Sequence, residues 1–455
     1  MKPVRPRLAA LITTAALALG GCAVTTDDVD RTGGVSTSAR AVADGTGVWD
    51  ATAVHEISVE AAEADLDEMF ATYSSTGEKD WVTATVTIDG DTFEDAGLRL
   101  KGNSSLRGAS VDSDPATLPW LIRLDKFVDD ASLDGSSEFV VRSNSTETSL
   151  NEALALDLLA KAGLASEHAV ATSFSVNGTD AQLRLVVQNL DEDWEEENFS
   201  GAGLLYKSES GGDWSWRGED PAAYEDVFDQ ETGDEDDMTP LIDFLDFVNN
   251  STDEELEAGL ASRLDVDAFA RYLAFEDLVD NFDDIDGPGN NSFLRWDADS
   301  DAFTVVAWDH NLAFGVSNVG GDGGPGGRAG GSDGWPGGAV GAPGGERPAM
   351  PEGMEGMEGK EGERPAGPPD GGGPGGGGPG GGRSNVLVER FTSVEQWADL
   401  VDQARADLTS DLFTSGYAEE VLDQWVGVLI EQASDLVDTD TVQSEADAVR
   451  ARLST

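Results

Sequence analysis

The sequence predicts an α+β protein in which a β-rich N-terminal lobe is followed by a helical C-terminal lobe. Alternating apolar and polar residues, the pattern of half-buried strands, dominate from about residue 54 to residue 207. From residue 239 onward, apolar residues recur every three or four positions, as in amphipathic helices. One predicted hairpin, near residue 300, interrupts the helical part, and we expect its loops to lie near the junction of the lobes.

The N-terminal lobe is predicted to be mainly antiparallel. A helix is expected at 61–73, and Asn177-Gly178 forms a tight turn between two of the strands. A longer helix is expected to begin at Ser149, with Glu152 completing a capping box, and to end at Ala162 before Gly163. The strands are expected at 54–59, 81–88, 92–101, 120–127, 138–142, 170–176, 181–187 and 204–207.

The C-terminal lobe is predicted from helix start signals and apolar stripes. Thr239-Pro240 has the residue types of an N-cap and first helical position. Ser393 and Gln396 form a second predicted capping box. Further helices are expected at 253–263, 267–280, 394–408, 418–437 and 441–453.

A segment of different composition, residues 320–383, interrupts this lobe. It contains 29 Gly and 10 Pro in 64 residues and almost nothing able to form a core. Such composition indicates a disordered insertion. The predicted domain therefore covers 51–319, and 384–455 supplies helices that complete the helical lobe.

The central hairpin carries the candidate chemistry. Its predicted strands are separated by the acidic turn 297–301, with Asp286 and Asn291 before the first strand and Asp309 after the second. A hairpin brings its outer ends together, so these three oxygen-bearing side chains should converge. Asp-x4-Asn followed by a separate Asp suits magnesium-dependent phosphoryl transfer, because one carboxylate orients the attacking hydroxyl while an amide and a second carboxylate hold the metal.

Chance and calcium binding are the alternatives at this hairpin. Acidic residues make up 89 of the 455 positions, so short Asp/Asn spacings also arise in solvated loops. The turn from Asp297 resembles the start of an EF-hand, but Ala302 and Trp308 stand where that loop needs Gly and Glu.

The formal net charge of −61 excludes some classes of partner and favours others. It argues against nucleic-acid binding, which needs Lys and Arg to neutralise phosphate. It favours divalent cations. With three His and one Cys, a zinc site also lacks ligands.

The N-terminus has the pattern of a bacterial lipoprotein signal peptide, residues 1–21. A basic start precedes an apolar stretch, 8–19, that is too short to span a membrane as a helix. Leu19-Gly20-Gly21-Cys22 then matches a lipobox, and Cys22 is the only cysteine. We expect Cys22 to be lipidated, with 22–50 as a flexible stalk and the protein on the extracytoplasmic face of the membrane.

Several segments together resemble the CotH family, the spore-coat-type atypical protein kinases. They are spread from residue 98 to residue 315, on both predicted lobes. The segments are LRLKGNSS at 98–105, IRLDKF at 122–127, VNG at 176–178, LLYK at 204–207, DGPGNNSF at 286–293 and WDHNLAFG at 308–315.

This resemblance implies a divergent protein-kinase-like fold and transfer of the ATP γ-phosphoryl to Ser or Thr of a surface or coat protein, with Mg²⁺ or Mn²⁺. Asp286 resembles the catalytic-loop aspartate, Asn291 its metal-binding companion and Asp309 the second metal ligand. The Gly-Asn-Ser-Ser turn, with Asn103 and Ser104, could lie over the phosphates.

The chain also departs from the family pattern. Leu118–Leu121 stand where relatives carry a lysine, so Lys101, Arg123 and Lys207 compete for the role of phosphate-binding cation. Gln188 lies where a Glu is common, and the arginine expected at the start of the Ser149 helix is absent. These departures leave open an alternative function, a non-catalytic pseudokinase that binds partners in surface or coat assembly.

Overall fold

The computed structural model describes residues 45–106, 109–210, 212–233, 236–287, 290–316 and 385–453. The predicted signal peptide, Cys22, most of the predicted stalk and the segment 320–383 lie outside these ranges. None of the helices in the described ranges is both long and apolar enough to cross a membrane.

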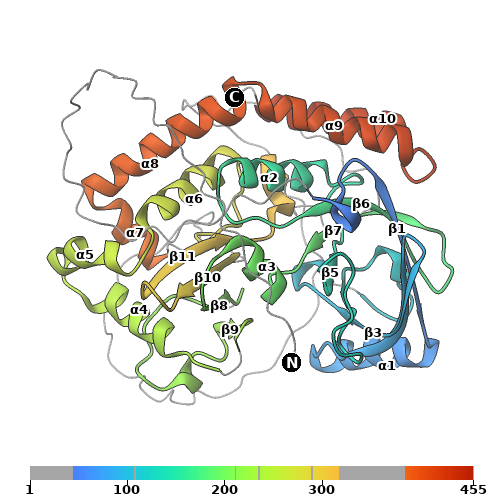
Figure 1. Ribbon diagram of the computed structural model, residues 1–455, viewed down its shortest axis with the longest axis horizontal. Coiled ribbons are helices and arrows are strands. Elements are labelled where there is room, and N and C mark those ends of the chain that lie inside the picture. Colours follow the sequence, from blue (N-terminus) through green and yellow to red (C-terminus); the bar gives the residue numbers. More distant parts are fainter. Residues whose placement is uncertain are drawn as a thin grey trace, which may run out of the picture.

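The N-terminal lobe is a closed seven-stranded barrel in the order β1-β2-β3-β4-β5-β7-β6 (Figure 1). Neighbouring strands are antiparallel except β1 and β6, which pair in parallel with Val54 opposite Ala171 and close the barrel. Apolar side chains fill its interior, as the period-2 burial of β2 illustrates. The strands are β1 (Val54–Ala61), β2 (Val82–Ile88), β3 (Asp91–Leu100), β4 (Trp120–Arg123), β5 (Glu138–Val141), β6 (Ala169–Val176) and β7 (Gln182–Gln188).

Two helices accompany the barrel. Helix α1 (Glu63–Thr76) buries Leu66, Met69 and Phe70. Helix α2 (Leu150–Lys161) is buried along most of its length and lies between the barrel and the helical lobe (Figure 1).

The helical lobe is built around a four-stranded antiparallel sheet in the order β11-β10-β8-β9. These strands are β8 (Gly203–Ser208), β9 (Phe228–Gln230), β10 (Ser292–Asp297) and β11 (Ala302–Ala307). The remaining α-helices are α3 (Glu192–Asn198), α4 (Thr239–Asn250), α5 (Asp253–Gly259), α6 (Val266–Leu278), α7 (Val386–Thr392), α8 (Glu395–Leu408), α9 (Tyr417–Gln432) and α10 (Thr439–Leu453). Short helical turns are η1 (Gly47–Trp49), η2 (Ser104–Leu106), η3 (Pro115–Thr117), η4 (Pro221–Ala223), η5 (Leu260–Ser262), η6 (His310–Gly315) and η7 (Thr409–Thr414).

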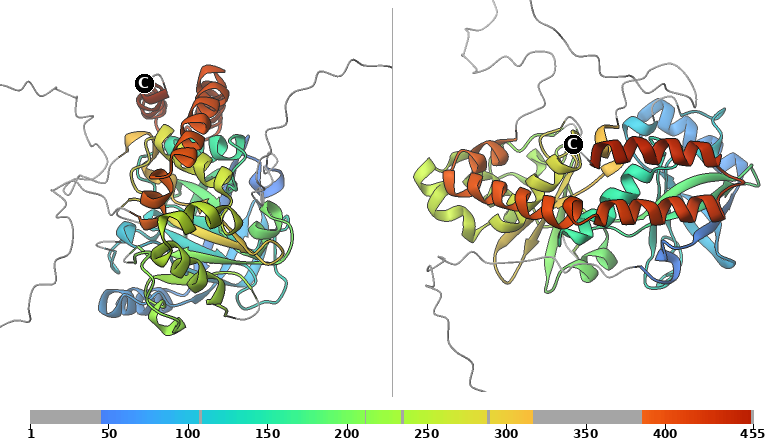
Figure 2. Two further views of the ribbon diagram at one scale, coloured as in Figure 1. Left: turned by 90° about the vertical axis from the view of Figure 1, so that its left-hand side faces the viewer. Right: turned by 90° about the horizontal axis from the view of Figure 1, so that it is seen from above.

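The C-terminal helices cross both lobes. Helices α8, α9 and α10 run along one side of the molecule from the helical lobe to the barrel (Figures 1 and 2). Gln432 at the end of α9 accepts a hydrogen bond from the backbone N–H of Val54 at 3.0 Å and donates one to the carbonyl of Thr52 at 2.9 Å. The segment 385–453 therefore joins the lobes as well as completing the helical one.

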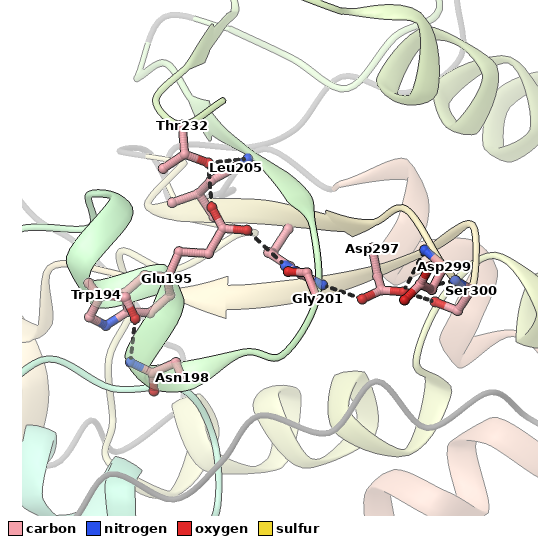
Figure 3. A network of polar contacts seen from close by, with 10 residues as sticks. Trp194, Glu195, Asn198, Gly201, Leu205, Thr232, Asp297, Asp299 and Ser300 are labelled. Atoms are coloured by element: carbon pink, nitrogen blue, oxygen red, sulfur yellow. Dashed lines mark hydrogen bonds and ion pairs between the residues drawn. The ribbon is translucent and has the colours of Figure 1, made fainter. Parts of the chain in front are cut away.

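The hairpin turn between β10 and β11 is held in place by the side chain of Asp297. Asp297 accepts hydrogen bonds from the backbone N–H groups of Asp299 and Ser300 and from the Ser300 hydroxyl (Figure 3). Its other oxygen pairs with the buried guanidinium of Arg295 at 2.7 Å. These bonds explain why the acidic turn is tight despite its charge.

The α+β class and the order of the lobes are confirmed, but several local predictions are wrong. Ser149 has φ 53°, in the left-handed region, and its hydroxyl forms no cap, so the predicted capping box is absent. Helix α8 likewise begins after Val394 without a side-chain cap from Ser393. The folded part also starts before residue 51, because Trp49 is buried and donates to Ser136 Oγ at 2.8 Å.

Candidate active site

The β10–β11 hairpin places the two predicted metal-binding loops at one end. Ser292 pairs with Ala307, so Asn291 and Trp308 leave the sheet beside each other. Asp309 follows with φ 66°, a left-handed conformation that is uncommon for a non-glycine residue. The register therefore places Asn291 and Asp309 at the same end of the hairpin, and the convergence of all three side chains, Asp286 included, stays a prediction.

Arg142, which follows β5, joins Asp309 to helix α2. Its guanidinium forms an ion pair with Asp309, and its Nε donates to Glu152 Oε2 at 3.1 Å. Burial by itself would lower the pKa of Arg142, but the two carboxylates reverse this effect and raise it. Arg142 is thus a permanent cation that ties the loop after β11 to the first turn of α2.

Trp308 lies against two cations. The Lys101 ammonium is 5.4 Å from the centroid of its ring and the Arg142 guanidinium 5.5 Å. Both groups therefore lie near the loop that carries Asp309. Cations next to an aromatic face in a partly desolvated site retain attraction for an anion.

The structure distinguishes the three competing cations. Arg123 is paired with Asp125 at 2.7 Å and with Glu138 at 3.0 Å, and Lys207 with Glu209 at 2.6 Å.

Within the described ranges Lys101 forms no ion pair; its Nζ donates to Asn189 Oδ1 at 2.8 Å. Burial lowers its pKa to about 8. The carboxylate of Glu231 opposes this effect, and the charges of Lys207 and Arg99 add to it.

Positive charges from β3, β8 and the segment before β2 interact with one another. Lys79 has a lowered pKa, first because it is buried and then because Lys207 and Arg99 are nearby. Arg99 lies 4.7 Å from the ring centroid of Trp81, and its buried Nε has no hydrogen-bond acceptor in the described part of the chain. Repulsion among these cations is relieved by a bound anion. Sequence reasoning missed Lys79 and Arg99 because they stand far apart in the chain and only the fold brings their charges close to Lys207.

The Gly-Asn-Ser-Ser turn reaches the helical lobe. Gly102 has φ 102°, and Asn103 Nδ2 donates to Ser210 Oγ just after β8 at 3.0 Å. Ser104 lies in the turn η2. This turn is therefore positioned between the lobes, next to Lys101.

The Asp286 loop is held by α6 and α7. Tyr272 of α6 accepts a hydrogen bond from the backbone N–H of Ile285 at 3.2 Å, and Asp286 Oδ1 accepts one from the backbone N–H of Asn385 at 2.7 Å. Burial raises the pKa of Asp286, and the charge of Glu389 contributes. A carboxylate with a raised pKa is a better proton acceptor.

The three predicted ligands have separate partners. Asn291 Nδ2 donates to Asp283 Oδ2 at 3.3 Å, Asp309 pairs with Arg142, and Asp286 accepts from Asn385. Among the described residues, no three His, Cys, Asp or Glu side chains are grouped closely enough to form a metal site by themselves. The donors of the two loops are carboxylate and amide oxygens, which suit Mg²⁺ or Mn²⁺, and a bound phosphate would supply the remaining ligands.

His310, next to Asp309, pairs with Glu276 of α6 in the interior of the protein. His310 is fully buried, and its Nε2 lies 3.1 Å from Glu276 Oε1. Burial alone would lower the pKa of His310, but the Glu276 carboxylate raises it to about 9. Glu276 also accepts a hydrogen bond from Asn281 at 2.8 Å, so it fixes both loops to α6.

Comparison with known proteins identifies the family. The model of the family described as CotH kinase protein matches residues 98–440, which is most of the chain. The chain belongs to the CotH kinase family, a class with kinase-like function. No curated protein matches the sequence.

Proposed function

We propose that the chain is a metal-dependent protein kinase that transfers the ATP γ-phosphoryl to a Ser or Thr of a cell-surface or coat protein. The observation that carries this proposal is the arrangement at one end of the β10–β11 hairpin. There Asn291 and Asp309 leave the sheet together, next to Lys101. Family membership supports a kinase-like activity, and we infer a divergent kinase-like fold from the order of barrel, α2 and helical lobe.

Each residue has a role in this proposal. Asp286 accepts the proton of the attacking hydroxyl, and its raised pKa suits that role. Asn291 and Asp309 would hold Mg²⁺ or Mn²⁺, which when bound neutralises the phosphate charge. Lys101, assisted by Lys79 and Arg99, binds the phosphates, with Asn103 and Ser104 in the adjoining turn.

The test is phosphoryl transfer from γ-labelled ATP with Mn²⁺, to the chain itself and to a mixture of surface proteins. We expect label on Ser or Thr with the wild type and a loss of at least about a hundredfold with Asp309→Asn, since removing one electrostatic contributor lowers the rate by roughly 10²–10³. Asp299→Asn is the matched control. It removes the same charge at the exposed opposite end of the hairpin.

Equal labelling by the two variants, or no labelling by any protein, would favour the alternative function. A non-catalytic binding protein is supported by the ion pair of Asp309 with Arg142 and by the contact of Asp286 with Asn385. Both contacts occupy groups that the enzyme needs.

A further inference from the structure

Lys101 lies at one end of a hydrogen-bonded chain of three side chains from different parts of the barrel. Its Nζ donates to Asn189 Oδ1 at 2.8 Å, and Asn189 Nδ2 donates to Glu138 Oε2 at 2.6 Å. Lys101 follows β3, Asn189 follows β7 and Glu138 is the first residue of β5. Because Glu138 and Asn189 are only 6% and 8% exposed, water competes little for these bonds.

The amide of Asn189 can make both hydrogen bonds in one orientation only. An ammonium group has no acceptor, so the side-chain oxygen must face Lys101. An ionised carboxylate has no donor, so the amide nitrogen must face Glu138. Asn189 therefore separates the two charges, and it uses only one of the three donors of the ammonium group.

The carboxylate of Glu138 is also held from its other oxygen. Arg123 Nη1 pairs with Glu138 Oε1 at 3.0 Å, while Arg123 Nε donates to Asp125 at 2.7 Å. Burial raises the pKa of Glu138, and the charges of Arg123 and Lys101 and the hydrogen bond from Asn189 oppose that rise. Glu138 is therefore a fixed carboxylate that acts on Lys101 across the amide.

Other charged groups also act on the Lys101 ammonium. Carboxylates favour its charged form and cations disfavour it; these groups are Glu231 and Glu138, and Lys207 and Arg99. Arg142 lies against the same Trp308 ring. Within the described ranges none of the carboxylates forms an ion pair with Lys101, so the hydrogen bond to Asn189 is the contact that fixes the position of its ammonium group.

We propose that Asn189 and Glu138 are positioning residues, which hold the ammonium group of Lys101 for phosphate binding without neutralising it. The amide prevents a direct ion pair between Lys101 and Glu138, and the carboxylate fixes the amide. An ammonium group paired directly with a carboxylate would attract a phosphate less, because the two opposite charges offset each other. This inference rests on the phosphate-binding role proposed above for Lys101.

The first readout is the pH titration of Lys101 in the full chain without ATP. It follows the ε-carbon signal of ¹³C-labelled lysine, and Lys101→Arg identifies that signal. We expect Asn189→Ala to move the titration midpoint upward by about one pH unit or more, because the ammonium then pairs directly with Glu138. Asn189→Ala combined with Glu138→Gln should lack this rise, since the carboxylate is gone.

The second readout is ATP affinity with Mg²⁺, measured by calorimetry at pH 6.5, where Lys101 carries its charge. Asn189→Ala should weaken ATP binding by about fivefold or more, and the double variant should recover most of the lost affinity. A merely structural role of Asn189 predicts the loss in both variants.

Asn250→Ala is the matched control for both readouts. It removes an amide that also donates to a carboxylate at 2.6 Å, that of Asp246, on an exposed part of α4. Both the titration of Lys101 and the affinity for ATP should stay as in the wild type.

Glu138→Gln alone keeps the proposal testable if Asn189→Ala fails to fold, since a glutamine oxygen can still accept from Asn189. This variant should lower the titration midpoint of Lys101 by about half a pH unit or more, because a favourable charge is lost. The proposal is overturned if Asn189→Ala or Glu138→Gln titrates like the wild type, or if the double variant binds ATP as weakly as Asn189→Ala. A wild type that binds no ATP overturns the phosphate-binding role and the function proposed above, whereas the titrations separately decide whether Asn189 keeps the two charges apart.

Discussion

At the scale of single residues, Arg142 is the most informative position. Its partner Glu152 has a side chain only 3% exposed, so removing the guanidinium leaves a carboxylate in the interior. Breaking a buried pair from one side costs about 3–5 kcal/mol. We therefore expect Arg142→Ala to lower the free energy of unfolding by that amount, measured by urea denaturation.

Two comparisons isolate the cause of this effect. Arg142→Met with Glu152→Leu should recover most of the lost stability, because it removes both charges. Arg450→Ala breaks ion pairs with the exposed Asp423 and Asp447 and should cost less than about 1 kcal/mol. Similar losses for Arg142→Ala and Arg450→Ala would contradict the buried-pair interpretation.

Lys101 gives a prediction about pH. Its pKa is lowered to about 8 from 10.5, so the folded protein loses this proton before the unfolded chain does. Stability therefore increases as pH rises from about 8 to 10.5, whereas attraction for phosphate decreases. ATP binding, measured by calorimetry with Mg²⁺, should weaken by up to about tenfold between pH 7 and pH 9.

Lys101→Arg provides the control for that titration, because arginine stays charged throughout this range. The variant should bind ATP with little dependence on pH between 7 and 9. A wild-type affinity that is constant over the same range would show that Lys101 is not the phosphate-binding cation.

At the scale of secondary-structure elements, α2 is positioned by the C-terminal helix α10. Glu445 accepts hydrogen bonds from the backbone N–H groups of Glu147 and Thr148, both at 2.9 Å, and from the Thr148 hydroxyl. The carboxylate thus holds the segment that leads into α2. Glu152, in the first turn of that helix, depends on this placement.

We expect Glu445→Ala to increase hydrogen exchange at the amides of Glu147 and Thr148 by about tenfold or more, since a bond to a charged group contributes roughly 1.5–3 kcal/mol. Glu431→Ala, an exposed change on α9, is the matched control. Unchanged protection in Glu445→Ala would mean that the loop alone fixes the start of α2.

Periodicity predicted most elements but not their caps. The hairpin and the helix 150–161 follow from apolar spacing and turn residues. Ser149 has a left-handed backbone, and its buried hydroxyl has no hydrogen-bond partner in the described part of the chain; the distant Glu445 holds the preceding residues instead. Helix α3, with the sequence EDWEEEN, has no apolar period to reveal it.

At the scale of the whole molecule, long-range pairing was outside the reach of sequence patterns. The barrel closes through β1 and β6, which are distant in sequence, and the α9 contact to β1 joins Gln432 to Val54. In the candidate site, too, local spacing could be read from the sequence whereas contacts between distant segments could not. The spacing of Asp286, Asn291 and Asp309 was readable, but Arg142 was missed because its partner Asp309 lies in a distant segment.

The central proposal is that oxygen ligands from the two hairpin loops bind a divalent cation together with ATP. The most direct test is an electron paramagnetic resonance titration of Mn²⁺ in the presence of ATP. The account predicts saturable binding by the wild type and by Asp299→Asn, and at least tenfold weaker binding by Asn291→Ala and Asp309→Asn, a loss of about 1.4 kcal/mol or more. Indistinguishable Mn²⁺ binding by all four proteins would contradict it.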